Sequence, residues 1–584
     1  MKKLTLILAL LFALLAIGCG GEKEFPVVNN DPVTITALND RSAASSALSG
    51  TDALGREIRP VGQKKDKLVG LFYFLWLGNY YHEGEQMFSD IYDVSKMDLD
   101  YVLSPGGSPF SRMHFWGEPL FGYYNMRDRW VVERHIRMFI AADIDFLAFD
   151  TTNNEYYPTV LDVVLDVLLD YQKQGYSVPK IMFLTNTDSS TRVKEIYEYV
   201  YAKEDYRSLW FTDDDEGRNP DRKPWITMNL KETAYLPQRV RSCFYFKESQ
   251  WPNQPYSENG FPWIEFTRPQ PEHGGIVSVS VAQNSGMHMS DSVQYKDSPN
   301  EIDYYNRNWG RGYTTEGKND ASKIAEGANF EEQWDNAIAL DPHIIFVTGW
   351  NEWAALKLAT TVEGIGNTVV FFDCFDREFS RDIEPVNGVD GDNYYMQLIR
   401  NIRRFKGTDG SGIAFEKKTI AAWSDWENVA SGVTEPTSGA RDFTNAALNG
   451  NYTSEAPIND IVELRAAEDE ENLYFLITAA KDLTAYDDAD FMTLYLKTGA
   501  SGYTCKIAGK DGAIALLPSG NGGTAKVERS GKYLWFTVSK VAIGYRDGVE
   551  VKVADHAAIE QNILNAYTEG DVAPYGRLNY RFYG

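Results

Sequence analysis

The sequence is poor in cysteine and in basic residues, and it has one long apolar run. Its four cysteines, spread over 584 residues, are too scattered to predict the disulfide framework of small secreted domains. Lysine and arginine number 57 against 83 aspartate and glutamate residues, so the formal net charge is −26. A field of this sign repels phosphate backbones and anionic lipid surfaces. Nucleic acid is therefore not an expected partner.

Two motifs of cofactor-binding proteins are also missing. Cysteine and histidine residues never occur with the spacing of a metal site, and no glycine-rich phosphate loop follows the first predicted strand. We therefore expect neither a metal nor a cofactor. The chain is instead rich in core-forming residues, with 43% hydrophobic and 14% aromatic side chains. At this length, that composition predicts two or more folded domains.

The long apolar run lies at the beginning of the chain. Two lysines precede residues 4–17, which are too few to span a membrane but match the central part of a secretory signal. The run ends in Leu15-Ala16-Ile17-Gly18-Cys19, which resembles the lipobox of bacterial lipoproteins. The resemblance implies a signal peptide at 1–19 and lipidation of Cys19. An ordinary signal peptide with a chance cysteine is the alternative.

The residues that follow suggest where such a lipoprotein would be found. The sequence Gly-Gly-Glu-Lys-Glu at 20–24 resembles the acidic tag of surface-exposed lipoproteins. We therefore expect a cell-envelope protein on the outer membrane, exposed at the surface, which contacts the membrane through its lipid anchor only. Residues 20–62 lack sustained periodicity, as expected of a tether or N-terminal segment.

The region 63–410 alternates between short apolar runs and helical patterns, which is typical of βα units around a parallel sheet. Helical spacing of apolar residues predicts helices near 132–140, 161–168 and 193–200. We predict the α/β class and a (β/α)8 TIM barrel, with the hidden eighth strand near 101–103. An open doubly wound sheet is the alternative. Seven strands are expected, at 68–76, 144–150, 180–186, 224–229, 242–247, 275–283 and 343–350.

The pattern changes near residue 410. Helical spacing stops, and short alternating runs such as Asn472–Ile477 and Lys532–Thr537 are separated by glycine-rich turns. This pattern predicts an all-β sandwich over 411–584. Short motifs at 423–426, 471–475, 490–496 and 576–582 are similar to the β-sandwich carbohydrate-binding modules of family 9. The similarity implies a module that binds carbohydrate or serves as a spacer.

In a βα barrel, catalytic groups lie at the carboxyl ends of the strands. Acidic residues at or after predicted strands are Asp150, Glu265 and Glu352. A pair of such carboxyl groups is what glycoside hydrolysis requires, one to protonate the leaving oxygen and one to act as nucleophile or base. Each could instead be a helix cap or an ion-pair partner. Trp350 and Trp353 beside Glu352 favour the catalytic interpretation, because indole walls raise a carboxyl pKa.

Four segments in order resemble the glycoside hydrolase family 71/99-like barrels, which include the WbsX-type sugar enzymes. They are Val69–Trp76, Ile144–Asp150, Val347–Ala354 and Asp392–Gly407, and they span nearly the whole predicted barrel. The resemblance implies a hydrolase that cleaves a polysaccharide or glycan. In family 99, two glutamates three residues apart share the chemistry. Here Glu352 matches the first, but Ala355 stands where the second would be.

The missing glutamate leaves the second catalytic acid open. Asp150, Glu265 and the acidic loop 375–385 are the candidates, although that loop could also be a solvated turn in which Arg381 pairs with an acid. Three aromatic residues, Tyr73, Trp76 and Trp116, resemble the sugar platform of the family, although Trp116 could belong only to a lid. Seven residues are expected to contact substrate: these three, Trp350, Asn351 and Trp353 around Glu352, and Asp382 in the acidic loop. We expect an endo-acting glycoside hydrolase. A surface lipoprotein that binds glycan through a degenerate barrel, without cleaving it, is the alternative.

Overall fold

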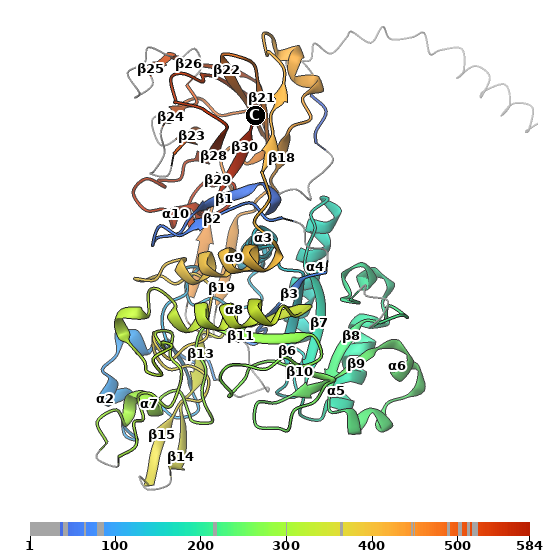
Figure 1. Cartoon of the computed structure of the whole chain (residues 1–584), viewed down its shortest axis with the longest axis vertical. Helices are drawn as coiled ribbons and strands as arrows, with labels where there is room; N and C mark the ends of the chain where they lie inside the picture. Colours follow the sequence, from blue (N-terminus) through green and yellow to red (C-terminus); the bar gives the residue numbers. More distant parts are fainter. Residues whose placement is uncertain are drawn as a thin grey trace, which may run out of the picture.

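The chain folds into a β-sandwich that lies on top of a barrel in the view of Figure 1, which shows the computed structural model. The structure describes residues 35–38, 45–62, 66–78, 87–213, 219–298, 301–362, 366–445, 448, 450–487, 491–499, 505–510, 514–516 and 524–584. Cys19 lies outside these residues. Within them, no helix is long and apolar enough to cross a membrane.

Eight strands form a parallel sheet in the order β10-β9-β8-β7-β6-β3-β12-β11. All the neighbouring pairs are parallel, and the end strands β10 and β11 contact each other, which brings the sheet close to closure. The predicted (β/α)8 barrel is confirmed. The strands are β3 (Leu68–Tyr73), β6 (Phe146–Thr151), β7 (Lys180–Thr185), β8 (Trp225–Met228), β9 (Tyr245–Gln250), β10 (Gly260–Pro262), β11 (Ile276–Ser280) and β12 (Ile344–Thr348).

The eighth strand is not where the sequence predicted it. Residues 99–102 form the short helix α2 (Leu99–Val102), because the Asp98 side chain caps it by accepting from the Tyr101 amide. The missing strand is β10, whose three residues are too few to show an alternating pattern. The prediction of a strand near 101–103 was therefore wrong.

Helices cover the outside of the barrel in the connections that are long enough to hold them. The apolar faces of α3, α4 and α5 are buried, which confirms the three helices predicted from spacing. The helices are α3 (Arg129–Ala142), α4 (Pro158–Lys173), α5 (Ser189–Ile196), α6 (Gln238–Cys243), α8 (Ala328–Leu340) and α9 (Asn393–Lys406).

A small sheet, a hairpin and a short helix lie in the connections at the carboxyl end of the barrel. The connection after β3 contains β4 (Tyr92–Asp93) and β5 (Met113–Phe115), which form a small sheet with β13 (Ala354–Leu356). Strands β14 (Leu358–Val362) and β15 (Gly366–Val370) form a hairpin beyond β13. Helix α7 (Asp291–Gln294) follows β11. These additions place long loops around the mouth of the barrel.

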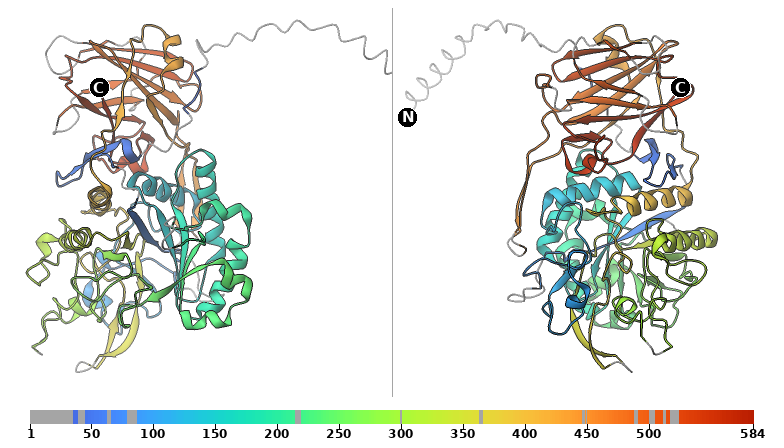
Figure 2. Two further views of the ribbon diagram at one scale, coloured as in Figure 1. Left: turned by 45° about the vertical axis from the view of Figure 1, so that its right-hand side comes forward. Right: turned by 90° about the vertical axis from the view of Figure 1, so that its left-hand side faces the viewer.

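Two sheets form the second domain, and the predicted sandwich is confirmed (Figure 2). Inward-facing side chains such as Phe475 and Phe582 contact each other between the sheets. The first sheet has the order β2-β1-β30-β28-β23-β24, from β2 (Glu57–Ile58), β1 (Leu48–Thr51), β30 (Asn579–Tyr583), β28 (Gly548–Asp555), β23 (Thr493–Lys497) and β24 (Cys505–Ala508), with β16 (Ile413–Ala414) and β29 (Asp571–Ala573) beside it. The second has β17 (Glu416–Lys417), β21 (Ile461–Glu468), β22 (Asn472–Ala479), β27 (Tyr533–Ser539), β26 (Thr524–Ser530), β25 (Ile514–Leu516) and β18 (Gly432–Thr434).

Part of the predicted tether belongs to this sandwich. Leu48 and Ser49 of β1 pair antiparallel with Tyr580 and Asn579 of β30. The expectation of a tether over all of 20–62 is therefore corrected for 45–62. The backbone N–H and C=O groups of this segment pair at the edge of a sheet. A strand of four residues is too short for its sequence pattern to reveal this pairing.

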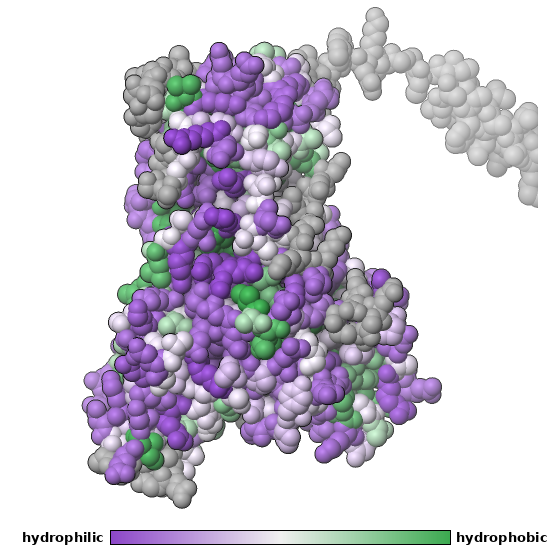
Figure 3. All heavy atoms as spheres, in the orientation of Figure 1, coloured by the Kyte–Doolittle hydropathy of each residue, from purple (hydrophilic) through white to green (hydrophobic). Residues whose placement is uncertain are grey.

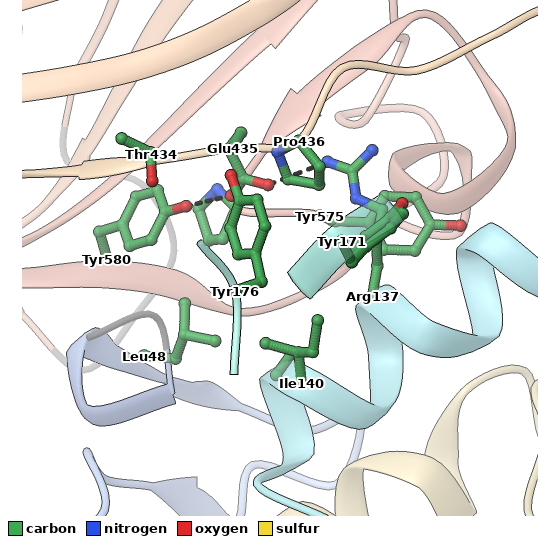
Figure 4. A pocket seen from close by; sticks show the side chains of 12 residues that line it. Leu48, Arg137, Ile140, Tyr171, Tyr176, Thr434, Glu435, Pro436, Tyr575 and Tyr580 are labelled. Carbon is green, nitrogen blue, oxygen red and sulfur yellow. Dashed lines mark hydrogen bonds and ion pairs between the residues drawn. The ribbon is translucent and has the colours of Figure 1, made fainter. Parts of the chain in front are cut away.

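The two domains are joined by buried ion pairs. Arg137 of α3 lies 2.9 Å from Glu435, and the Arg441 guanidinium lies 2.7 Å from Asp128, the N-cap of α3. Arg441 belongs to the hairpin of β19 (Arg441–Asn445) and β20 (Gly450–Ser454). Between the domains lies a small cavity of about 30 Å³, where Figure 4 shows the bonds from Glu435 to Arg137 and Tyr580. The outer surface seen in Figure 3 is largely hydrophilic.

Candidate active site at the mouth of the barrel

A group of carboxyl side chains gathers beside the carboxyl ends of β6, β3 and β12. Strand β3 lies between the other two. Asp150 is the penultimate residue of β6, and Glu352 follows β12 by four residues. Both side chains are buried. Because parallel strands end on one side of a barrel, these two predicted catalytic residues belong to the same mouth.

Arg381 organises the group. Its Nε and Nη2 donate to the two carboxylate oxygens of Glu352, at 2.8 and 2.9 Å. Nη2 also lies 2.8 Å from Oδ1 of Asp373, and the guanidinium stands over the ring of Trp263. The third nitrogen, Nη1, has no hydrogen-bond partner among the described residues. One buried cation therefore serves two carboxylates.

Burial raises the pKa of each interior carboxyl group in this cluster. The pKa of Glu352 is raised well above its usual value by burial, against which the Arg381 guanidinium acts in the opposite direction. Burial also raises the pKa of Asp150, although Thr152 donates to its Oδ1 from both amide and hydroxyl. The pKa of Asp382 is raised to about 7 by burial. Such groups can hold and release protons near neutral pH.

Asp382 is held by a layer of aromatic side chains behind the cluster. Trp116 donates its indole N–H to Oδ2 of Asp382 and stacks on Trp353 at 4.8 Å between ring centroids. The Trp353 indole donates to Oε2 of Glu384 at 2.6 Å, and Glu384 Oε1 lies 2.9 Å from Nε2 of His135. These contacts hold Trp353, the residue that follows Glu352, in place.

The structure differs from the predicted sugar platform. The rings of Tyr73, Trp76, Trp116, Trp350 and Trp353 are at most 5% exposed, so they leave little surface on which a sugar could stack. Asn351 is also buried, because its amide bonds the backbone N–H and C=O of Phe74. Of the seven residues predicted to contact substrate, six are interior supports, and Asp382 lies in the carboxyl cluster.

Glu265 is not part of the cluster. It lies on the connection between β10 and β11, and its Oε1 is 2.6 Å from Nε2 of His273. The ring of Tyr256 stacks on the imidazole of His273, with 4.8 Å between the ring centroids. The charges that most affect the pKa of Glu352 are instead those of Arg381, Asp373 and Asp382. Arg381 and Asp373 also act on the pKa of Asp150. Of the three predicted catalytic residues, the structure therefore brings together Glu352 and Asp150.

Sequence reasoning missed the positions of Arg381 and Asp373. Arg381 was noted only as an ion-pair partner within an acidic loop, and Asp373 lies two residues before the predicted limits of that loop. The density of acidic residues at 373–384 was the available signal. Among the described residues, no group of three or more histidine, cysteine, aspartate or glutamate side chains has the arrangement of a metal site.

Comparison with known proteins gives few matches. No family profile matches the chain, and no curated protein matches it by sequence. Two solved structures of the GH99 endo-alpha-mannosidase from Bacteroides thetaiotaomicron are similar in fold, at 14% and 13% sequence identity and a TM-score of 0.33 for both. Each comparison covers 58% of this chain and 97% or 98% of the mannosidase. The barrel assignment rests on the strand order of this chain.

Proposed function

We propose that this protein is a glycoside hydrolase that cleaves a polysaccharide or complex glycan. One observation supports the proposal most directly: two carboxyl groups from different strands, Glu352 and Asp150, lie buried at the mouth of one barrel with raised pKa values. Hydrolysis of a glycosidic bond needs such a pair, with one group protonated and one ionised. The resemblance of the strand motifs to family 71/99 barrels points to the same chemistry.

The two carboxyl groups take different roles. Arg381 donates to both oxygens of Glu352, which favours the ionised form of that residue. Asp150 has no ion-pair partner as close as this; the two neutral donors of Thr152 lower its pKa, but burial raises it by more, and the proposal therefore assigns the proton to Asp150. In this proposal Asp150 protonates the leaving oxygen, and Glu352 acts as the nucleophile or as the base that activates water.

The substrate of the proposed reaction is a chain of sugars. The small sheet of β4, β5 and β13 and the β14–β15 hairpin extend the mouth of the barrel, which suits an endo-acting enzyme. An α-mannan is among the glycans to test, since the mannosidase of similar fold acts on α-mannosyl linkages, as its name states. We also propose that Cys19 anchors the protein at the cell surface, where such a glycan would be met.

A screen for glycan cleavage tests the proposal. The soluble chain from residue 20 would be incubated with yeast mannan, xyloglucan and mucin glycans, beside the variants Glu352→Gln and Glu265→Gln. We expect the wild type and Glu265→Gln to release sugars and Glu352→Gln to bind the same glycan without cleaving it. Cleavage that persists in Glu352→Gln would remove Glu352 from the mechanism.

The second candidate function is glycan binding without catalysis. It is favoured by Ala355, which replaces the second glutamate of the family motif, and by the ion pair that occupies both oxygens of Glu352. If both the wild type and Glu352→Gln bind a glycan and neither cleaves it, this function replaces the first.

A further inference from the structure

An exposed aromatic side chain stands beside the carboxyl cluster. Phe372 is 46% exposed, and the next residue, Asp373, contacts Arg381. Aromatic rings recognise sugars by presenting an open face to their C–H groups, which the buried tryptophans of this barrel do not offer. Phe372 therefore meets a requirement that the predicted platform fails.

The backbone holds Phe372 against the loop that follows β11. The Met289 amide donates to the Phe372 carbonyl oxygen at 3.1 Å, and the Phe371 amide donates to the Ser290 hydroxyl at 3.0 Å. The segment beyond the β14–β15 hairpin is thus paired to the chain next to α7 (Figure 1). An aromatic side chain on such a fixed backbone loses little conformational freedom when it binds a ligand.

A histidine fixes the ring from the side. His288 meets Phe372 edge to face, with ring centroids 4.2 Å apart. Its Nδ1 lies 2.9 Å from Oδ2 of Asp291, whose side chain is only 2% exposed. This contact engages Nδ1 and leaves Nε2 for a further hydrogen bond. Nε2 makes no hydrogen bond to another described residue.

Asp373, the residue after Phe372, supplies a second polar group. One of its oxygens contacts Arg381, while the side chain is 45% exposed. An exposed ring and an imidazole nitrogen thus lie together, and a half-exposed carboxylate belongs to the next residue of the chain. A pyranose offers the matching chemistry, with an apolar C–H face and hydroxyl groups at its rim that donate hydrogen bonds.

We infer that Phe372, His288 and Asp373 form a sugar-binding subsite for a pyranose adjacent to the one at the carboxyl cluster. The inference rests on the proposed function, because the subsite and the cluster would hold neighbouring units of one glycan. Asp291 is a positioning residue, since it orients the imidazole without facing the sugar. Arg381 links the two parts, because it contacts both Glu352 and Asp373.

The chain provides a matched control for this subsite. Tyr256, His273 and Glu265 repeat the combination of exposed aromatic, histidine and acid, and Tyr256 is 57% exposed. In this second set the acid contacts Nε2 of the imidazole, and none of its members contacts Arg381 among the described residues. If aromatic exposure alone decided glycan binding, the two sets would behave alike.

The test measures kcat and KM on whichever of yeast mannan, xyloglucan or mucin glycan the soluble wild type cleaves. We expect Phe372→Ala to raise KM about tenfold with kcat within threefold, His288→Ala to act in the same direction, and Phe372→Trp to restore KM. Tyr256→Ala should stay within twofold of the wild type. Thermal unfolding of each variant checks that it is folded.

The outcomes separate this inference from the proposed function. If Phe372→Ala keeps the wild-type KM while Glu352→Gln stops cleavage, the subsite is wrong and the hydrolase stands. If the wild type binds one of these glycans in affinity gels without cleaving it, the hydrolase fails, and loss of binding in Phe372→Ala but not in Tyr256→Ala still supports the subsite. If the wild type neither cleaves nor binds any of the three, both are overturned.

Discussion

The mouth of the barrel and the contact between the domains both bury charged side chains, but they balance the charges differently. Between the domains, three guanidinium groups each meet a carboxylate of their own: Arg137 with Glu435, Arg441 with Asp128 and Arg577 with Asp392. At the mouth, Arg381 serves Glu352 and Asp373 at once. Between the domains, one-to-one ion pairs hold the two surfaces together. At the mouth, there are more buried carboxyl groups than cations, so their pKa values stay raised and they can transfer protons.

Loss of the cation at the mouth should have the largest effect. Arg381→Met removes the donors of Glu352, so the pKa of that carboxyl rises further and its ionised form is depleted. We expect kcat to fall about 10²- to 10⁴-fold, and the limb of the pH–rate profile that belongs to Glu352 to move to higher pH. Arg381→Lys, which keeps the charge, should recover part of this shift. An unchanged profile would mean that Arg381 has no electrostatic role.

The corresponding change between the domains should affect stability and leave activity alone. Arg577 donates twice to Asp392, which is buried and also receives the Tyr567 hydroxyl. Arg577→Met leaves this buried carboxylate without its cation and should lower the free energy of unfolding by about 3 kcal/mol. Urea denaturation measures the loss. Activity per folded molecule below the transition should equal that of the wild type, and a fall in kcat would mean that this interdomain ion pair also supports catalysis.

The raised pKa of Asp382 predicts a pH dependence of stability. Its pKa of about 7 lies above the ordinary value of 3.8, so the folded chain binds this proton more tightly than the unfolded chain does. Its contribution is complete below about pH 4 and is lost as the pH rises toward 7, at up to about 1.4 kcal/mol per pH unit. Asp382→Asn should flatten the unfolding free energy over this range. Glu316→Gln, at an exposed carboxylate, should leave the slope unchanged.

Glu265→Gln should have the smallest effect on catalysis. The carboxyl group contacts His273 and not the Arg381 cluster, so we expect kcat/KM within about twofold of the wild type. The measurement uses the same glycan as the other variants. A loss comparable to that of Glu352→Gln would restore Glu265 as the second catalytic acid and remove Asp150 from that role.

The sequence predicted those parts of the fold that leave a local pattern. Buried parallel strands such as β6 and β12 are continuous apolar runs, and they were found close to their observed limits. Strand β10 has only three residues, and β1 pairs with a strand more than 500 positions away. Neither a very short strand nor a distant partner leaves a period in the sequence.

The candidate site was predictable to the extent that its residues follow strands. Asp150 and Glu352 were named for that reason, and the structure places both beside one barrel mouth. The same reasoning failed for Trp350 and Trp353, because a tryptophan beside a catalytic motif looks the same whether it faces a ligand or the core. Phe372 was missed because an exposed ring after a surface hairpin is distinguished only by what surrounds it.

The pairing of β1 with β30 constrains the order in which the chain can assemble. Asn579–Tyr583 are made more than 500 residues after Leu48–Thr51. During synthesis, β1 must therefore wait for β30 before its sheet can close. A product that lacks β30 would leave both β1 and β28 with an uncovered edge. Synthesis of β30 is thus the step on which closure of this sheet depends.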